Sequence, residues 1–109
     1  MTRGEAIAET RRLIAEGERL EVAPALGALR LWIQLSDDLL GTIWGSMDRY
    51  HLVWLGVGKP TWTVRGRAMT AEEEAAYVRE VAEQKTAVLR MSLQALDEQR
   101  MPFVGETPG

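Results

Sequence analysis

The chain has 109 residues and a mass of 12.2 kDa, enough for one small domain with one hydrophobic core but not for a separate catalytic domain. Thirteen Lys and Arg against sixteen Asp and Glu give a net charge of −3, which disfavours a dedicated nucleic-acid binder, because such proteins carry a basic excess. The absence of cysteine excludes disulfides and cysteine nucleophiles, and the single histidine excludes a His-rich metal site.

The sequence shows no targeting or membrane segment. Charges at Arg3 and Glu5 interrupt the start of the chain, where a signal peptide needs an apolar stretch. The most apolar candidate for a membrane span, residues 26–43, is broken by polar residues that include Asp37 and Asp38. We therefore expect a cytoplasmic protein that does not enter a membrane.

The first predicted helix covers residues 2–16. Apolar residues such as Leu13 recur there at helical spacing between Glu and Arg. Thr2 followed three residues later by Glu5 is a capping-box pattern, and Gly17 is a common helix stop.

The second predicted helix begins near Pro24 and is apolar on adjoining faces. One stripe steps by three and four residues through Leu26, Leu29, Ile33, Ser36, Leu40 and Ile43. A neighbouring face carries Leu31, Trp32, Leu35 and Leu39. This pattern predicts the central helix of a bundle, with both faces in the core.

A shorter third helix is predicted from Ser46 to Leu55, with Tyr50, Val53, Trp54 and Val57 on its apolar side. The run 52–55 would also suit a strand. The following residues, about 58–69, form an irregular loop in which a short extended or hairpin-like excursion remains open.

The fourth helix has the clearest signal. The capping box from Thr70 to Glu73 precedes a stretch free of Gly and Pro up to Pro102, so the helix can run for about 28 residues. We predict an all-α, four-helix bundle-like single domain over residues 1–101, with a long C-terminal helix, one irregular loop and a flexible tail at 102–109.

Each catalytic pattern in the sequence is incomplete. His51 follows Asp48 by three residues, and such a pair could act as a general base, but a surface or part-buried histidine beside an acid is the favoured interpretation. The run 56–61 resembles the end of a phosphate loop, yet the required first glycine is replaced by Val53 and the Ser or Thr after the lysine by Pro60. We assign no catalytic residue and no cofactor.

An acidic cluster supplies the enzymatic alternative. Glu80 and Glu83 form an E-x-x-E pair on the fourth helix. Asp37 and Asp38 lie on the second helix, and Asp97 and Glu98 lie near the end of the fourth. Clustered carboxylates bind Mg²⁺ in all-α nucleotide hydrolases. Such enzymes need two facing acidic pairs, and only one pair has the spacing here. A metal-dependent nucleotide hydrolase is therefore an alternative, and no metal ligand is assigned.

The irregular loop carries a possible phosphate contact. Lys59, Arg65 and Arg67 flank Trp62 and could hold a nucleic-acid backbone while the indole stacks on a base. Three cations on an acidic chain give only weak, salt-sensitive binding. A plain connecting loop is favoured over this second alternative.

The tryptophans point to association with protein. A bundle of this size can bury Trp32 and Trp44, and tryptophan is enriched at interface hot spots. We predict a homodimer whose surface is centred on Trp54 and Trp62, with Leu93 and Leu96 behind them. The predicted function is a non-enzymatic protein–protein interaction module, acting as a small regulator or adaptor.

An ordered set of residues also resembles a known type of domain. The set is residues 13–20 (L-I-A-E-G-E-R-L), Trp32, residues 43–45 (I-W-G) and Tyr50. It resembles a small helical accessory domain of bacterial defence and signalling proteins, in which an L-I-x-E-G-E-x-L helix precedes a Trp-containing helix, an I-F-G turn, a Tyr pair and a long last helix. Trp44 stands for the Phe, and His51 for the second Tyr. The resemblance implies an all-α fold, a bacterial or phage origin and an accessory role, without catalytic residues.

Overall fold

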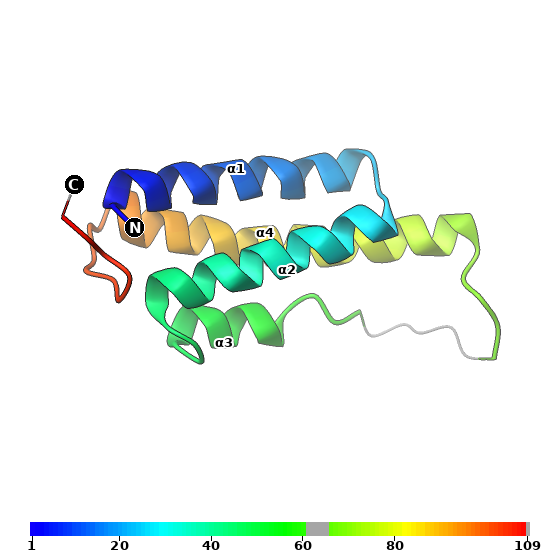
Figure 1. Cartoon of the computed structure of the whole chain (residues 1–109). Helices are drawn as coiled ribbons and strands as arrows, with labels where there is room; N and C mark the ends of the chain where they lie inside the picture. Colours follow the sequence, from blue (N-terminus) through cyan, green and yellow to red (C-terminus); the bar gives the residue numbers. More distant parts are fainter. Residues whose placement is uncertain (61–65, 109) are drawn as a thin grey trace.

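The chain folds into helices, with short connections between the first three and a longer one, residues 57–70, between α3 and α4 (Figure 1). The computed structural model describes residues 1–60 and 66–108, and within them the helices are α1 (Arg3–Val22), α2 (Leu26–Trp44), α3 (Arg49–Gly56) and α4 (Ala71–Asp97). This described part contains no strand, so the all-α fold is confirmed and the strand alternative for 52–55 is wrong. None of these helices is long and apolar enough to cross a membrane.

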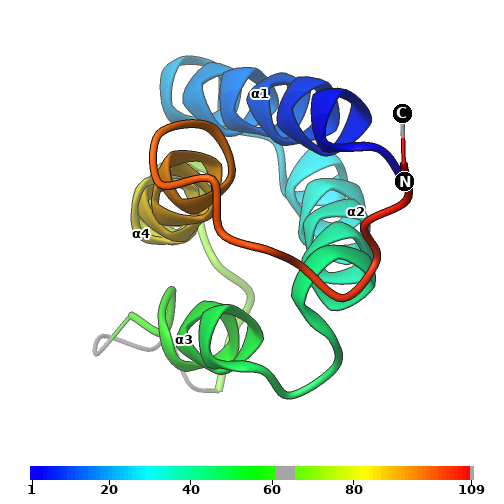
Figure 2. The same cartoon turned by 90° about the vertical axis from the view of Figure 1, so that its left-hand side faces the viewer.

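Successive helices run in opposite directions, and the short helix α3 covers only part of the length of α4 (Figure 1). Viewed end-on, α1 and α3 occupy opposite corners, with α2 and α4 between them (Figure 2). The most extensive interface is between α1 and α4, and both α2 and α4 contact each of the other helices. The second helix was expected to be the central one, and the structure shows two central helices, α2 and α4, among those described.

The helix starts follow from their capping residues. Thr2 with Glu5 and Thr70 with Glu73 form complete capping boxes at α1 and α4, as predicted. The cap of the third helix is Asp48, two residues after the predicted Ser46, because the carboxylate of Asp48 accepts the backbone N–H of Tyr50.

Gly17 does not end the first helix, which continues to Val22. The residue is buried where α1 crosses α4, and a Cβ there would overlap Thr86 Oγ1 and come within 2.7 Å of Trp32 Cζ2. The missing side chain thus serves close helix packing rather than helix termination.

Aromatic side chains join the helices in the core. Trp32 and Trp54 pack edge to face with ring centroids 5.6 Å apart, and Trp44 stacks on Tyr50 at 4.6 Å. The indole N–H of Trp32 donates to the Leu13 carbonyl at 2.8 Å, so the polar edge of this buried ring is satisfied. The core positions predicted for Trp32 and Trp44 are confirmed.

The segment after α4 packs on the bundle, whereas a flexible tail was predicted from 102. Phe103 is buried, with its ring 6.3 Å from that of Trp44, and the N–H of Gly105 donates to the Ile43 carbonyl. The segment crosses the end of the bundle toward the N-terminus (Figure 2). The domain therefore extends past residue 101 to Thr107, whose N–H donates to the Met1 carbonyl.

Candidate functional site

The single histidine pairs with an acid that the sequence did not single out for it. His51 Nε2 lies 2.7 Å from Asp37 Oδ1 on α2, and His51 Nδ1 accepts the backbone N–H of Met47 at 2.9 Å. The backbone donor at Nδ1 places the ring proton on Nε2, which donates it to Asp37. Both ring nitrogens are occupied and the side chain is buried, so His51 offers no free nitrogen to a substrate.

The predicted pairing of His51 with Asp48 is wrong. Asp48 instead caps α3, because its carboxylate points at the first N–H groups of that helix. Sequence spacing alone brings residues three apart onto one helix face, but Asp48 lies outside the helix, and the Asp37 contact spans fourteen residues.

Lys85 is a buried cation beside this pair, with 8% of its surface exposed. Its ammonium donates to the Trp54 carbonyl at 2.6 Å and lies 4.4 Å from the centroid of the Trp54 ring. Burial lowers the pKa of Lys85, an effect that the Asp37 carboxylate opposes and Lys59 reinforces.

The contacts of Lys85 hold the end of α3 rather than form a reaction centre. Trp54 is in the last turn of α3, where carbonyl groups lack helical partners and attract a cation. The lysine stem fills the space beside Gly58, whose φ of +74° and N–H bond to Gln84 Oε1 carry the chain away from the helix. A nucleophilic lysine needs an amine that is free and accessible, whereas the amine of Lys85 is hydrogen-bonded and buried.

The acidic residues of the hydrolase alternative lie apart from one another. Asp37 is paired with His51, while Asp97 pairs with an arginine of α1 at 2.9 Å. Glu80 and Glu83 lie along α4, and within the described part of the chain no three His, Asp or Glu side chains gather to hold a metal ion. The acidic-cluster hydrolase gains no support from this arrangement.

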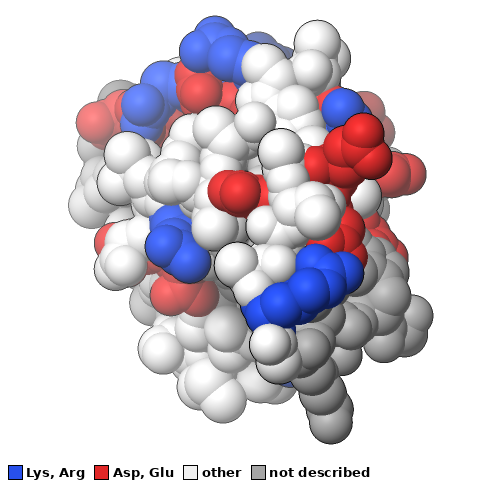
Figure 3. All heavy atoms as spheres, turned by 90° about the vertical axis from the view of Figure 1, so that its right-hand side faces the viewer, with Lys and Arg blue, Asp and Glu red and all other residues white. Residues whose placement is uncertain are grey.

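The cations of the basic loop are also dispersed. Arg67 forms a two-point ion pair with Glu73 at 2.7 and 3.0 Å, and Lys59 is exposed. Arg65 lies outside the described residues. At the end of the molecule where α4 begins, both signs of charge are interspersed (Figure 3). The phosphate-contact alternative is therefore not supported by the described cations.

The predicted self-association surface is corrected at two positions. Trp54 and Leu96 are completely buried, because Trp54 packs against Trp32 under Lys85 and Leu96 belongs to the inner stripe of α4. Leu93 is half-buried, and Trp62 lies outside the described residues.

The structure exposes a different set of apolar side chains, on α2. Leu31 is 62% exposed and Leu35 is 42% exposed, one turn apart on the same face. They border a shallow groove of about 220 Å³ between α1 and α2, which Arg12 and Glu16 flank. The sequence shows an apolar surplus on this helix, which favours both a central position in the core and self-association, but it places the centre of the dimer surface at Trp54 and Trp62 instead.

Larger hollows than this groove lie elsewhere on the described surface. One, of about 460 Å³, lies between α3 and the end of α4, and its apolar lining includes Val53, Met91 and Met101. The larger, of about 870 Å³, lies where α1 starts and the C-terminal segment ends.

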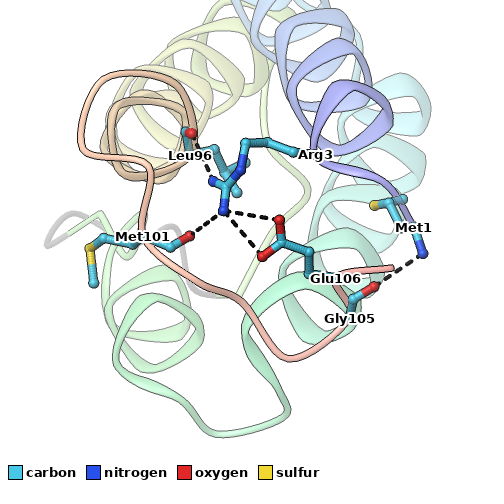
Figure 4. Close-up of polar contacts among 6 residues, drawn as sticks. All are labelled: Met1, Arg3, Leu96, Met101, Gly105 and Glu106. Atoms are coloured by element: carbon cyan, nitrogen blue, oxygen red, sulfur yellow. Dashed lines mark hydrogen bonds and ion pairs between the residues drawn. The ribbon is translucent and has the colours of Figure 1, made fainter. Parts of the chain in front are cut away.

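The larger hollow is built around Arg3, which binds groups of the protein itself (Figure 4). The guanidinium of Arg3 donates to the carbonyls of Leu96 and Met101 and pairs with Glu106 at 3.1 Å. These bonds tie both chain ends to α4, and they leave Arg3 committed to the protein itself rather than to an anionic ligand.

Comparison of the chain with protein families, with known proteins and with solved structures finds no match. The resemblance to a bacterial accessory domain therefore stays a prediction.

Proposed function

We propose that this chain is a non-enzymatic protein–protein interaction module, a small regulator or adaptor that acts in the cytoplasm by binding protein. The observation that carries the proposal is the pair of outward-facing leucines on α2, Leu31 and Leu35, beside a groove. Exposed apolar side chains grouped beside a groove are typical of interaction sites.

The state of the reactive groups supports the same proposal. The buried imidazole of His51 and the buried ammonium of Lys85 each make short bonds that hold α3 in place. Their roles are structural, which leaves binding through the surface as the function that the geometry favours.

Site-specific photocrosslinking tests the proposal inside the cells that express the protein. A photoreactive aromatic residue replaces Leu31 in one variant and Ala87, an exposed position on α4, in the matched control. We expect a protein adduct of defined mass at position 31 and not at position 87, and its loss when Leu35 is also changed to Asp. The absence of any protein adduct at position 31 would contradict the proposal.

A further inference from the structure

The outer face of α2 is turned away from the other three helices (Figure 2). At about 100° per residue, the buried residues of α2 cover one side of the helix, and Leu31, Gln34, Leu35 and Asp38 lie on the other. No described helix covers this side, so its apolar centre faces solvent in the single chain.

Two opposite charges flank that apolar centre. Arg30 and Asp38 are both exposed and lie eight residues apart. Neither side chain makes an ion pair with the residues that the structure describes, whereas other exposed arginines, such as Arg12, Arg19 and Arg90, pair with a glutamate. Arg30 and Asp38 are thus available to a partner.

The charged and glycine positions on this face are spaced symmetrically about Gln34, with opposite charges at the two equivalent charged positions. Arg30 and Asp38 lie four residues to either side of it, and Gly27 and Gly41 lie seven to either side. Nothing lies within 4 Å of the place where a Cβ would stand on either glycine. Both outer turns can therefore approach another helix closely, because the distance between packed helices depends on the side chains at the contact.

This symmetry fits a second copy of the same helix running in the opposite direction. A two-fold axis through Gln34 brings Arg30 of each copy to the level of Asp38 of the other, which gives two equivalent ion pairs. Leu31 and Leu35 of one helix then pack against the same two leucines of the other. A parallel arrangement would instead place like charges together.

We propose that the chain forms a homodimer through antiparallel pairing of α2 about Gln34, with Arg30 and Asp38 setting the register. The inference rests on the proposed interaction function and names a second copy as the partner. It also moves the expected dimer surface from Trp54, which is buried, to the outer face of α2.

Charge reversal tests the pairing. Light-scattering mass is measured over roughly 5 to 500 µM, a range suited to an interface of one helix pair. We expect a mass that rises from 12.2 kDa toward twice that value. Arg30→Glu alone and Asp38→Arg alone each weaken dimerisation about tenfold or more, because like charges then meet, and the double variant recovers it.

A matched control separates register from net charge. Arg90→Glu makes the same change of charge on an exposed part of α4, and we expect it to leave the dimer intact. Circular dichroism of each variant verifies that the helices remain. A mass of 12.2 kDa at every concentration, or single and double variants that dimerise alike, would overturn the proposal.

Cysteine crosslinking tests the two-fold axis directly, since the chain has no cysteine of its own. Gln34→Cys places a thiol at the axis, opposite its own copy, and we expect a rapid disulfide-linked dimer under mild oxidation. Ala87→Cys on α4 is the control and is expected to stay mostly monomeric. Equal crosslinking of the two variants would contradict the assigned register.

The two proposals fail separately. A chain that stays monomeric but yields an adduct with a different protein at position 31 would disprove the dimer and retain the interaction module. A monomeric chain that yields no adduct would disprove both.

Discussion

Gly17 allows close helix packing because it has no side chain. Glycine within a helix normally lowers stability relative to alanine, because it leaves the unfolded backbone more freedom. Here α4 and α2 both pack so close to Gly17 that the Thr86 hydroxyl of α4 and the Trp32 ring of α2 occupy the space of a Cβ. The local cost of the glycine is therefore offset by the close contact between α1 and α4.

The substitution Gly17→Ala is accordingly expected to destabilise the protein, against the usual trend for helices. The added methyl overlaps packed atoms of Thr86 and Trp32, and overpacking of this kind lowers the free energy of unfolding by about 1–3 kcal/mol. Urea denaturation measures the change.

Gly4→Ala is the control, because it lies on the same helix with open space around the new Cβ. It should be neutral or stabilise by up to ~1 kcal/mol. A Gly17→Ala variant as stable as the Gly4→Ala variant would show that α4 does not approach α1 as closely as described.

The start of α4 is held by a small network of charges. Glu73 receives two bonds from Arg67 and one from the Thr70 backbone N–H, while the Thr70 hydroxyl accepts the Glu73 N–H. The Arg67 contact first, and the Thr70 bond second, lower the pKa of Glu73 from 4.5 to about 2. Arg67, which the sequence analysis considered as a phosphate contact, thus stabilises the capping box at the start of α4, the longest helix.

This lowered pKa predicts an acid dependence of stability. The unfolded chain binds a proton at Glu73 near pH 4.5 and the folded chain only near 2, so the contribution of Glu73 is complete above pH 4.5 and is lost as the pH falls toward 2. The Glu73→Gln variant has no carboxylate to protonate at this position. Its free energy of unfolding should therefore fall less steeply between pH 4.5 and pH 2 than that of the unmodified chain.

Urea denaturation at a series of pH values compares the two proteins. Glu72→Gln, in the same turn but outside the capping box, is the control and should keep the acid dependence of the unmodified chain. Equal slopes for Glu73→Gln and the unmodified chain would contradict the assigned contact with Arg67.

The two ends of the chain close the bundle together (Figure 4). The terminal amine of Met1 donates to the Gly105 carbonyl at 3.0 Å, and Arg3 links α1 to the last turn of α4 and to Glu106. Phe103 covers the end of the core beneath these bonds, beside the Arg3 guanidinium. The C-terminal segment is therefore part of the domain.

Phe103→Ala should lower the stability of the entire domain. Removing a buried phenylalanine at the edge of the core is expected to lower the free energy of unfolding by about 2–4 kcal/mol, just under the usual range for a central one. Val104→Ala is the matched control, because its side chain is 77% exposed, and a change below ~0.5 kcal/mol is expected. Thermal melting that is equally unaffected in both variants would mean that the segment is not packed on the bundle.

Local signals were sufficient for the presence of the helices and for the starts of α1 and α4. The capping boxes at Thr2 and Thr70, the periodic apolar stripes and the core positions of Trp32 and Trp44 all follow from residues a few positions apart, so they could be predicted from the order of the sequence. The all-α fold follows from the same short-range pattern.

The remaining features depend on which helices become neighbours, and periodicity carries no such information. The role of Gly17 arises from α4, the Asp37–His51 pair joins two helices, and the position of Phe103 requires both chain ends to meet. The helix α2 is apolar on adjoining faces. Which of these faces is buried, and that Leu31 stays in solvent, depends on how the helices pack in the bundle. A helix presents the same residues whatever it packs against, so burial, pairing and the exposed surface are set by tertiary contacts.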